Sequence, residues 1–250
     1  MNLAYWNQVN RNYESEILSV WDREQTGCIP RLLNIALQEI PDRSTAADLG
    51  CGVGKFLPLL CTRFETVHAC DFAQSGLDRA RQHCNTGHCH PLRFHCVDLT
   101  TDPMPFDPVK LALCINVLLM PSLDERLRAW RSVCNQVDHG GWLLLVVPSL
   151  ESMLLEQHLE RDSLLQSGLS CEQSLRHTLP EHSSLLELHQ GVHRIEGCPT
   201  KHYLREELQD LLTSHQLEPI RWERLRYSAS AESGDALWDW CVLSRRMEQV

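Results

Sequence analysis

The chain has 250 residues, of which 43% are hydrophobic and 22% charged, and its formal net charge is −10 at pH 7. A chain of this size and hydrophobicity is expected to form one α/β domain with a sizeable core. The net acidity argues against nucleic-acid binding, because binding a phosphate backbone requires clustered Lys and Arg, and the basic residues here are scattered.

The cellular location is predicted from the lengths of the apolar segments. The first thirty residues contain no apolar core of a signal peptide, and the longest apolar run, residues 142–147, is strand-sized. We therefore expect a cytoplasmic protein that binds no membrane. Its 12 cysteines are then expected to be thiols rather than a disulfide framework.

The N-terminal elements are predicted to be helical. Residues 2–26 carry aromatic and aliphatic side chains at helical spacing, and residues 29–40 form an amphipathic pattern with Pro30 in the first turn. Aromatic side chains at this spacing usually pack a helix against its neighbours.

A strand, a glycine turn and a helix are predicted next. The strand, residues 45–49, carries Asp48 near its end, and Gly50, Gly52 and Gly54 follow at alternate positions. Glycine adopts positive φ and lets a ligand approach the backbone closely. The N-terminus of the following helix offers unpaired N–H groups, so a flat or charged cofactor can lie against the main chain here.

Other interpretations of this loop fit less well. A phosphate-binding loop needs Ser or Thr after its lysine, but Phe56 follows Lys55. The dinucleotide fingerprint needs a third glycine where Lys55 stands, which disfavours a nicotinamide dehydrogenase. A turn without a ligand is also disfavoured, because three glycines cost backbone entropy.

Acidic residues end the next two predicted strands. Residues 67–70 lead into Asp71, and residues 92–97 lead into Asp98, with a helix over residues 74–84 between them. One carboxylate accepts two hydrogen bonds from a vicinal diol, so Asp71 is placed to bind ribose hydroxyls.

Histidines and cysteines crowd the segment between these strands, which raises the hypothesis of a zinc site. Their spacing matches no common ligand pattern, so no metal site is predicted. The residues concerned are His83, Cys84, His88, Cys89, His90, His95 and Cys96.

The fourth and fifth strands are predicted at residues 109–115 and 142–147. Asn116 and Val117 follow the fourth strand and are expected to face the ligand crevice at the carboxyl ends of the strands. A capping box beginning at Ser122 starts a helix that is predicted to extend to about residue 137, and residues 139–141 are expected to end it.

The remaining chain departs from simple alternation. Residues 149–199 are leucine-rich, lack Phe, Trp and Tyr, and are predicted to form a helical insertion. A helix beginning near Glu206 and strands at residues 216–227 and 237–244 complete the predicted elements.

The pattern Asp48-x-Gly50-x-Gly52-x-Gly54 closely resembles the first motif of class I S-adenosylmethionine-dependent methyltransferases. Residues 140–149 and 200–208 are also similar to segments of that family, and the resemblance is weakest over residues 149–199. It implies a Rossmann-like, doubly wound α/β fold with a seven-stranded sheet of order 3-2-1-4-5-7-6 and an antiparallel last strand. Residues 1–250 would form a single domain, with a helical lid at residues 1–27 and a substrate cap in the insertion.

The resemblance also implies S-adenosyl-L-methionine as cofactor and gives roles to particular residues. In the family, an acid matching Asp98 meets the adenine amino group, and the backbone N–H matching Leu99 reaches a ring nitrogen. The predicted cofactor-binding residues are Asp48, Gly50, Cys51, Gly52, Gly54, Asp71, Phe72, Asp98, Leu99, Asn116 and Val117.

Methyl transfer from a sulfonium is an in-line displacement, so the protein mainly aligns the reactants and excludes water. A general base is needed only if the nucleophile carries a proton. Tyr13, His202 and Tyr203 are the catalytic candidates, although His202 fits a surface histidine as well. No Asn/Asp-Pro-Pro-Tyr/Phe follows the fourth strand, which argues against methylation of nucleobase or glutamine amino groups.

The sequence therefore predicts an S-adenosylmethionine-dependent methyltransferase acting on a small molecule. The alternative is a cofactor-binding protein of the same fold that is directed at a protein or is not catalytic, with residues 149–199 as its binding surface. Formation of a homodimer through that insertion stays open.

Overall fold

The structure is a computed structural model. It describes residues 6, 20, 26–84, 92–179, 184–195, 197–227 and 237–248. The predicted lid therefore lies mostly outside the described residues, and so does the catalytic candidate Tyr13. Val20, which is described, is buried in the core.

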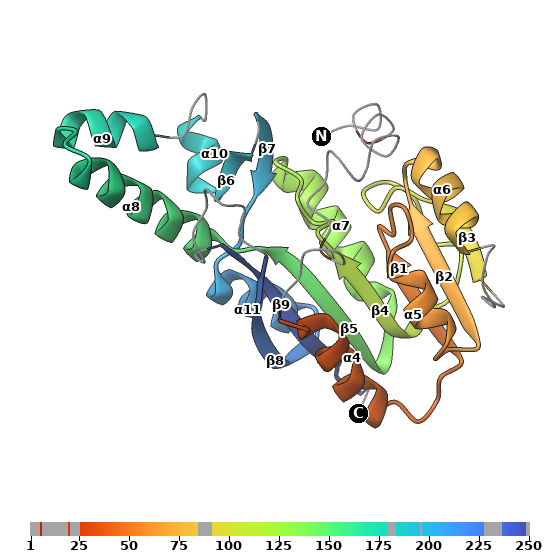
Figure 1. Ribbon diagram of the computed structural model, residues 1–250. Helices are drawn as coiled ribbons and strands as arrows, with labels where there is room; N and C mark the ends of the chain where they lie inside the picture. The colour runs from red at the N-terminus through yellow and green to blue at the C-terminus, as the bar shows by residue number, and fades with distance from the viewer. Residues whose placement is uncertain are drawn as a thin grey trace.

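A seven-stranded sheet of order β3-β2-β1-β4-β5-β9-β8 runs through the molecule (Figure 1). The strands from β3 to β5 are parallel, and β9 is antiparallel to both of its neighbours. This order confirms the predicted fold class, including the antiparallel last strand. The strands are β1 (Thr45–Leu49), β2 (Thr66–Asp71), β3 (Leu92–Cys96), β4 (Val109–Ile115), β5 (Val137–Pro148), β8 (Leu217–Arg226) and β9 (Trp238–Arg246).

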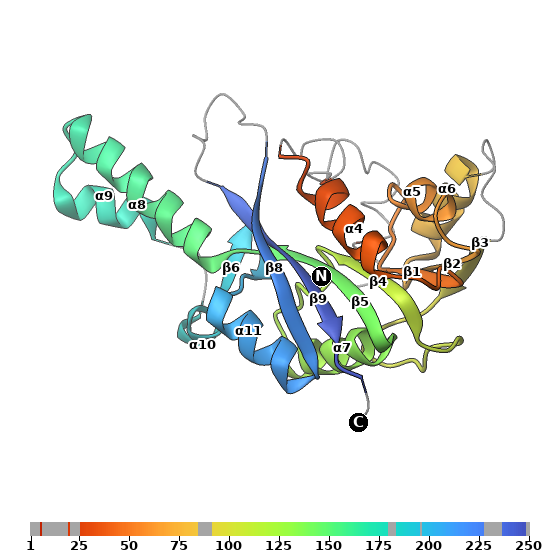
Figure 2. The ribbon, with the colours of Figure 1, turned by 90° about the horizontal axis from the view of Figure 1, so that it is seen from below.

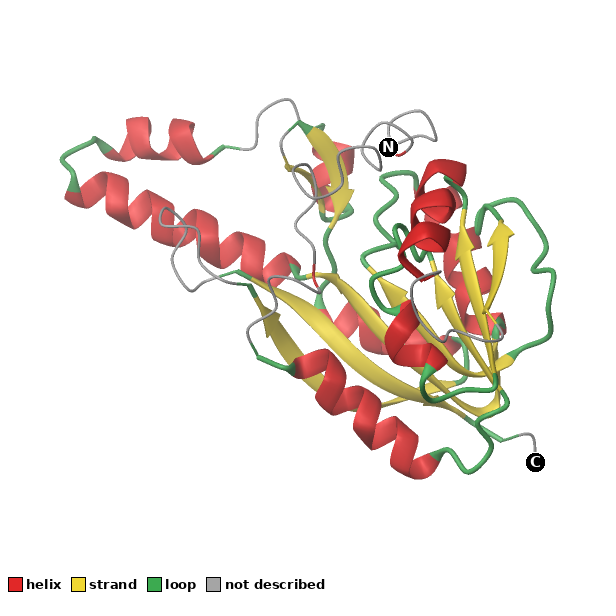
Figure 3. Cartoon of the chain, turned by 45° about the vertical axis from the view of Figure 1, so that its right-hand side comes forward, coloured by secondary structure: helices red, strands yellow, loops and turns green. Residues whose placement is uncertain are grey.

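Helices cover both faces of the sheet, as Figures 2 and 3 show. One apolar layer lies under α4, α5 and α6, and the other lies under α7 and α11. Successive residues of β5 alternate between the layers: Leu144 faces the first and Leu145 the second. Because both faces are buried, the central strands are continuous apolar runs. The helices are α4 (Cys28–Glu39), α5 (Leu57–Cys61), α6 (Gln74–Cys84), α7 (Leu123–Asn135) and α11 (Arg205–Ser214).

The start of β5 corrects one prediction. Residues 139–141 do not end the preceding helix; α7 ends at Asn135, and β5 begins at Val137. Val137 pairs with Val109, after which the register shifts so that Trp142 pairs with Leu111. Gly140 has φ +71° and accommodates this irregularity, so the glycines lie inside an irregular strand rather than at a helix end.

The insertion after β5 contains helices and a hairpin. Helices α8 (Leu150–Gln166) and α9 (Cys171–Thr178) project from the body beyond one end of the sheet (Figure 1). Helix α10 (Leu185–His189) leads to the antiparallel pair β6 (Val192–Ile195) and β7 (Cys198–Lys201). The helices agree with the leucine periodicity, whereas β6 was not predicted. Within the described residues no helix is both long and apolar enough to cross a bilayer.

We predict that Leu113→Ala lowers the free energy of unfolding by about 2–5 kcal/mol, because a fully buried leucine on the central strand β4 leaves a cavity. Leu185→Ala is the control, since Leu185 is 86% exposed, and its effect should stay within about 0.5 kcal/mol. Urea denaturation measures both. Equal losses for the two variants would contradict the assignment of β4 to the core.

Candidate functional site

The glycine turn after β1 is held against β2 by main-chain hydrogen bonds. The N–H groups of Gly50 and Cys51 both donate to the carbonyl oxygen of Cys70, at 2.7 and 2.8 Å. Gly50, Gly52 and Gly54 have φ values of +83°, +52° and +79°. These values lie in the left-handed region, which explains why glycine recurs at alternate positions.

Two of the glycines are also required by close packing. A Cβ atom on Gly50 would lie 2.3 Å from Cγ2 of Val117, and one on Gly54 would lie 2.8 Å from Cβ of Ala80. Gly50 therefore packs directly on the residue pair that follows β4, and Gly54 packs on α6. The turn is the junction between three segments.

Asp71 links the turns that follow β1 and β2. Its Oδ2 accepts a hydrogen bond from the N–H of Gly52 and its Oδ1 accepts one from the N–H of Ala73, both at 2.8 Å. Burial raises the pKa of Asp71, and these N–H donors oppose that rise. Each carboxylate oxygen has two lone pairs, so Asp71 keeps the capacity to accept hydrogen bonds from a diol.

Asp48 is buried with one oxygen unsatisfied. The residue is 2% exposed, and its Oδ2 has no hydrogen-bond partner among the residues that the structure describes. Burial, together with the nearby charge of Asp71, raises the pKa of Asp48 to about 7. An unsatisfied buried carboxylate oxygen costs free energy, which indicates that a ligand supplies the missing donor.

The other residues predicted to bind cofactor surround these acids. Burial raises the pKa of the Cys51 thiol, and the carbonyl of Phe72 accepts a contact from the Cys96 thiol at 3.6 Å. Oδ1 of Asp98 accepts hydrogen bonds from the N–H and hydroxyl of Thr100, at 2.8 and 2.7 Å. These bonds shape the turn that contains Leu99, which is buried.

Asn116 adopts left-handed backbone geometry, with φ +53°, immediately after β4. Its N–H donates to the carbonyl of Val146 at 2.9 Å, and its Nδ2 donates to Oδ2 of Asp239 at 3.1 Å. The amide oxygen Oδ1 is buried and has no partner in the described part of the chain. A strained residue with an unsatisfied polar atom is a common mark of a functional site.

Asp239 and Tyr227 are site residues that the sequence analysis missed. The Tyr227 hydroxyl donates to Oδ2 of Asp239, and burial raises the pKa of both side chains. Asp239 stands between Trp238 and Trp240 in an otherwise apolar strand. An acid inside an apolar strand is the sequence feature that could have identified Asp239 as a site residue, since buried acids need a partner or a function.

The sheet order gathers these residues along one edge. Asp48, Asp71 and Asp98 lie at or just beyond the carboxyl ends of β1, β2 and β3, and Asn116 follows β4. The antiparallel β9 begins at this same edge, where Asp239 pairs with Pro148 at the end of β5. Ligands of open α/β sheets bind outside this edge, at the point where the strand order reverses.

The other catalytic candidates lie where the insertion returns to the sheet. The Tyr203 hydroxyl donates to the carbonyl of Leu118 at 2.7 Å and accepts from Trp130 Nε1 at 3.1 Å, within the core. Tyr203 therefore anchors the insertion, and its catalytic role stays a prediction. His202 is buried with Nδ1 3.0 Å from the Thr200 carbonyl, and burial lowers its pKa to about 4.

The histidine and cysteine cluster of the metal hypothesis is described only in part, because residues 85–91 lie outside the described residues. Nδ1 of His83 lies 3.1 Å from the Val53 carbonyl, and Nε2 of His95 lies 3.0 Å from Nδ1 of His68. In the part of the chain that is described, no three potential ligands form a metal site.

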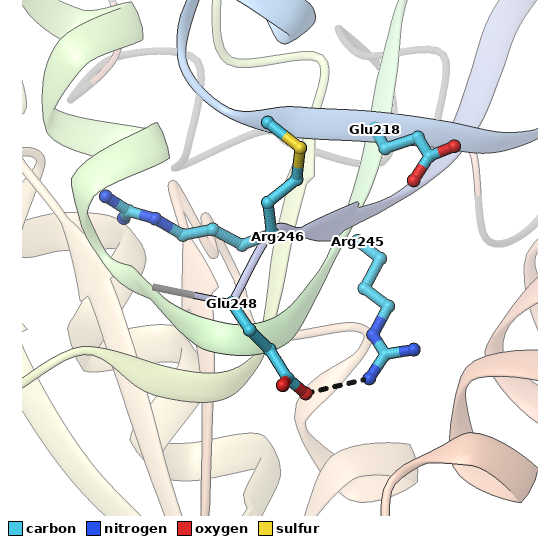
Figure 4. A pocket seen from close by; sticks show the side chains of 5 residues that line it. Glu218, Arg245, Arg246 and Glu248 are labelled. Carbon is cyan, nitrogen blue, oxygen red and sulfur yellow. Dashed lines mark ion pairs between the residues drawn. The ribbon is translucent and has the colours of Figure 1, made fainter. Parts of the chain in front are cut away.

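A hollow of about 230 Å³ lies at the opposite edge of the sheet (Figure 4). Its charged side chains are used internally: Arg245 and Glu248 form an ion pair at 3.5 Å. Arg246 donates to the carbonyls of Cys134 and Val137 at 2.9 and 2.8 Å. The hollow is distant from the glycine turn, so the functional site is assigned to the carboxyl edge. The residues lining it are Glu218, Arg245, Arg246, Met247 and Glu248.

Residues 46–141, which include the glycine turn and all three acids, match the sequence model of a methyltransferase domain. Over this stretch the chain is similar to the methyltransferase domain family. The predicted resemblance is thus confirmed, and S-adenosylmethionine is confirmed as the cofactor of this domain family. A sequence search of curated proteins finds no match.

Solved methyltransferases share the fold at low sequence identity. An S-adenosylmethionine-dependent methyltransferase from Methanosarcina mazei is 16% identical, with a TM-score of 0.62, and the match covers 86% of this chain and 98% of that one. The 1,6-didemethyltoxoflavin-N1-methyltransferase of Burkholderia thailandensis, solved with bound 1,6-didemethyltoxoflavin and S-adenosylhomocysteine, is 12% identical with a TM-score of 0.62. That match covers 98% of this chain and 87% of the other.

A third neighbour was solved with a protein partner. It is a putative methyltransferase of Haloferax volcanii in complex with the Trm112 methyltransferase activator. The match is 13% identical, covers 99% of this chain and 96% of the other, and has a TM-score of 0.60. At these identities the likenesses show the fold of this methyltransferase domain and not its substrate.

We predict that Gly50→Ala destabilises the domain by more than Gly168→Ala does. Both glycines have positive φ, which costs a side chain about 1–2 kcal/mol, but only Gly50 faces a close neighbour. Urea denaturation of the two variants separates backbone strain from overlap with Val117. Equal losses would mean that close packing of the turn adds nothing; adding Val117→Ala to Gly50→Ala should recover part of the loss.

Proposed function

We propose that the chain transfers a methyl group from S-adenosylmethionine to a small-molecule acceptor by in-line displacement. The observation that carries this proposal is the unsatisfied Oδ2 of Asp48 beside the glycine turn, at the edge where Asp71 and Asp98 also lie. A buried acceptor next to main-chain N–H groups fits a cofactor with a cationic amino-acid end and a nucleoside end.

Each acid has a proposed contact with the cofactor. Asp71 binds the ribose hydroxyls, because its carboxylate keeps free lone pairs beside Gly52. Asp98 and the backbone of Leu99 bind adenine, with Phe72 beside them. Asp48 accepts a hydrogen bond from the ammonium group of the methionine portion. The cofactor supplies the activated methyl group, and the chain orients it and excludes water.

The insertion and His202 are proposed to form the acceptor side. The N–H of Tyr203 donates to the carbonyl of Pro148 at 2.8 Å, so residues 149–199 begin and end at the carboxyl edge. We propose that these residues cap that edge and that residues 1–27 form a second cap. His202 is neutral near pH 7 because of its lowered pKa. If Nδ1 donates to the Thr200 carbonyl, Nε2 is left as a proton acceptor.

A small-molecule acceptor is supported by the acidic charge of the chain and by the structural neighbour solved with 1,6-didemethyltoxoflavin. Action on or through a protein is the second candidate, and a homodimer is a related one. Exposed leucines on the insertion favour a protein partner or a second copy of the chain, and so does the structural neighbour solved with its activator. The most exposed are Leu179, Leu185 and Leu186. We also propose a cytoplasmic location, from the composition alone.

We predict that the wild-type chain binds S-adenosylmethionine and S-adenosylhomocysteine, and that Asp71→Ala weakens binding of both by at least about tenfold. The loss follows from removing the acceptor of the ribose hydroxyls. Isothermal titration calorimetry measures both affinities, and circular dichroism checks that the variant is folded.

Asp78→Ala is the matched control, because Asp78 is an exposed acid on α6 that pairs with Arg81. Its affinities should equal those of the wild type. Absence of binding of either sulfur compound to the wild type at millimolar concentration would overturn the proposed function, and binding of NAD instead would favour the dehydrogenase alternative.

We predict that affinity for S-adenosylhomocysteine rises several-fold between about pH 6 and about pH 8, because the pKa of Asp48 is raised to about 7 and its carboxylate forms over this range. The attraction to the ligand ammonium is thus lost as pH falls. Asp48→Asn should show a much flatter profile in the same titrations. A wild-type profile as flat as that of the variant would show that Asp48 does not contact the ammonium.

A further inference from the structure

Asp239, Tyr227 and Asn116 form a buried polar cluster at the carboxyl edge of the sheet. Oδ2 of Asp239 accepts hydrogen bonds from the Tyr227 hydroxyl and from Nδ2 of Asn116, the latter at 3.1 Å. Within the described residues Oδ1 of Asn116 is buried without a partner, whereas the hydrogen bonds to Asp239 both go to its Oδ2. The cluster therefore presents an unused acceptor at Asn116, and Oδ1 of Asp239 takes no part in its hydrogen bonds.

No basic side chain of the described residues forms an ion pair with Asp239, which is 8% exposed. The nearby guanidinium of Arg224 lies instead over the rings of Trp238 and Trp240, 4.5 and 5.9 Å from their centroids. An acid buried without a counter-charge lowers stability. Its presence is explained if a ligand supplies the hydrogen-bond donor.

The cluster occupies one half of the edge, and the acids proposed to bind the cofactor occupy the other. Asp48, Asp71 and Asp98 belong to β1, β2 and β3, whereas the cluster belongs to β4, β9 and β8. Asn116 directly precedes Val117, on which Gly50 of the cofactor turn packs. The cluster is therefore next to the glycine turn that would hold the cofactor, and an acceptor bound at the cluster would lie beside it.

We propose that Asp239 binds the N–H or O–H group of the methyl acceptor and takes up its proton, with Tyr227 and Asn116 as positioning residues. This inference rests on the proposed function. In the step, the acceptor nitrogen or oxygen forms a bond to the methyl carbon, and the carbon–sulfur bond breaks with its electron pair going to sulfur. The N–H or O–H proton passes to the carboxylate and then to solvent, which leaves the methylated product and S-adenosylhomocysteine.

The proposal names a substrate class, namely acceptors whose nucleophile carries a proton, such as amines, phenols and azoles. A thioether or a fully substituted amine has no donor for the Oδ1 atoms of Asp239 and Asn116 and is disfavoured. The cluster thus selects acceptors by whether the nucleophilic atom carries a hydrogen-bond donor.

The test uses the full chain with and without saturating S-adenosylhomocysteine. The probes are two matched pairs: aniline with N,N-dimethylaniline, and phenol with anisole. In each pair the second member keeps the ring and lacks the donor. Ligand-observed NMR measures binding to the wild type, Asp239→Asn, Tyr227→Phe and Asp138→Asn. Asp138→Asn is the control, because Asp138 pairs with Lys110 at the opposite edge of the sheet.

We expect at least one donor probe to bind the wild type more tightly than its methylated partner. Asp239→Asn should weaken that probe by about tenfold or more and leave S-adenosylhomocysteine affinity unchanged, and Asp138→Asn should change neither. Failure of every donor probe to bind the wild type at millimolar concentration would overturn the inference, as would equal binding to Asp239→Asn.

Thermal denaturation adds a readout that separates function from structure. Burial raises the pKa of Asp239 in the folded chain, so its ionisation lowers stability as the pH rises, and Asp239→Asn removes that penalty. The variant should melt at the same temperature as the wild type or higher. A clear fall in melting temperature would indicate a structural role and overturn the inference.

The outcomes also separate this inference from the proposed function. A wild type that binds S-adenosylhomocysteine, combined with donor probes that are indifferent to Asp239→Asn, refutes only the role of Asp239. A wild type that does not bind S-adenosylhomocysteine refutes the proposed function itself, and the probes titrated without that ligand still report on the cluster.

Discussion

The site depends on one carboxylate, that of Asp71. It accepts hydrogen bonds from Gly52 and Ala73 and so joins the turns after two adjacent strands. The joined turns hold Gly50 against Val117, which sets the position of the segment after β4. Every acid of the candidate cofactor site, and Asn116 beyond them, is placed relative to this link.

A second constraint is the concentration of buried acids along one edge. Asp48, Asp71 and Asp239 all have raised pKa values, with burial as the main cause. Burying carboxylates costs folding free energy that the apolar layers on both faces of the sheet must offset. Proteins keep such groups where a ligand uses them, which is why the edge and not the hollow of Figure 4 is assigned as the site.

Much of the first half of the chain follows from local sequence. Alternating glycines, terminal acids and apolar runs predict β1, β4 and the start of α7 at the residues where they occur. The Gly140–Gly141 pair misled the prediction of a helix end, because glycine permits both a helix stop and an irregular strand. Only pairing with β4 selects the strand. The position of Tyr203 before a late helix suggested catalysis, yet its hydroxyl is used by Leu118 and Trp130 inside the core.

Short-range spacing in the sequence was enough to predict the glycine turn and the acids beside it, because each depends on a strand, positive-φ glycines, and an acid at the next strand end. Only the tertiary structure decided that Asp239 meets Asn116, which is 123 residues away along the chain. That contact arises because β9 inserts antiparallel between β5 and β8, which brings its first residues to the carboxyl edge. Strand order is set by packing of the whole sheet, and no local pattern encodes it.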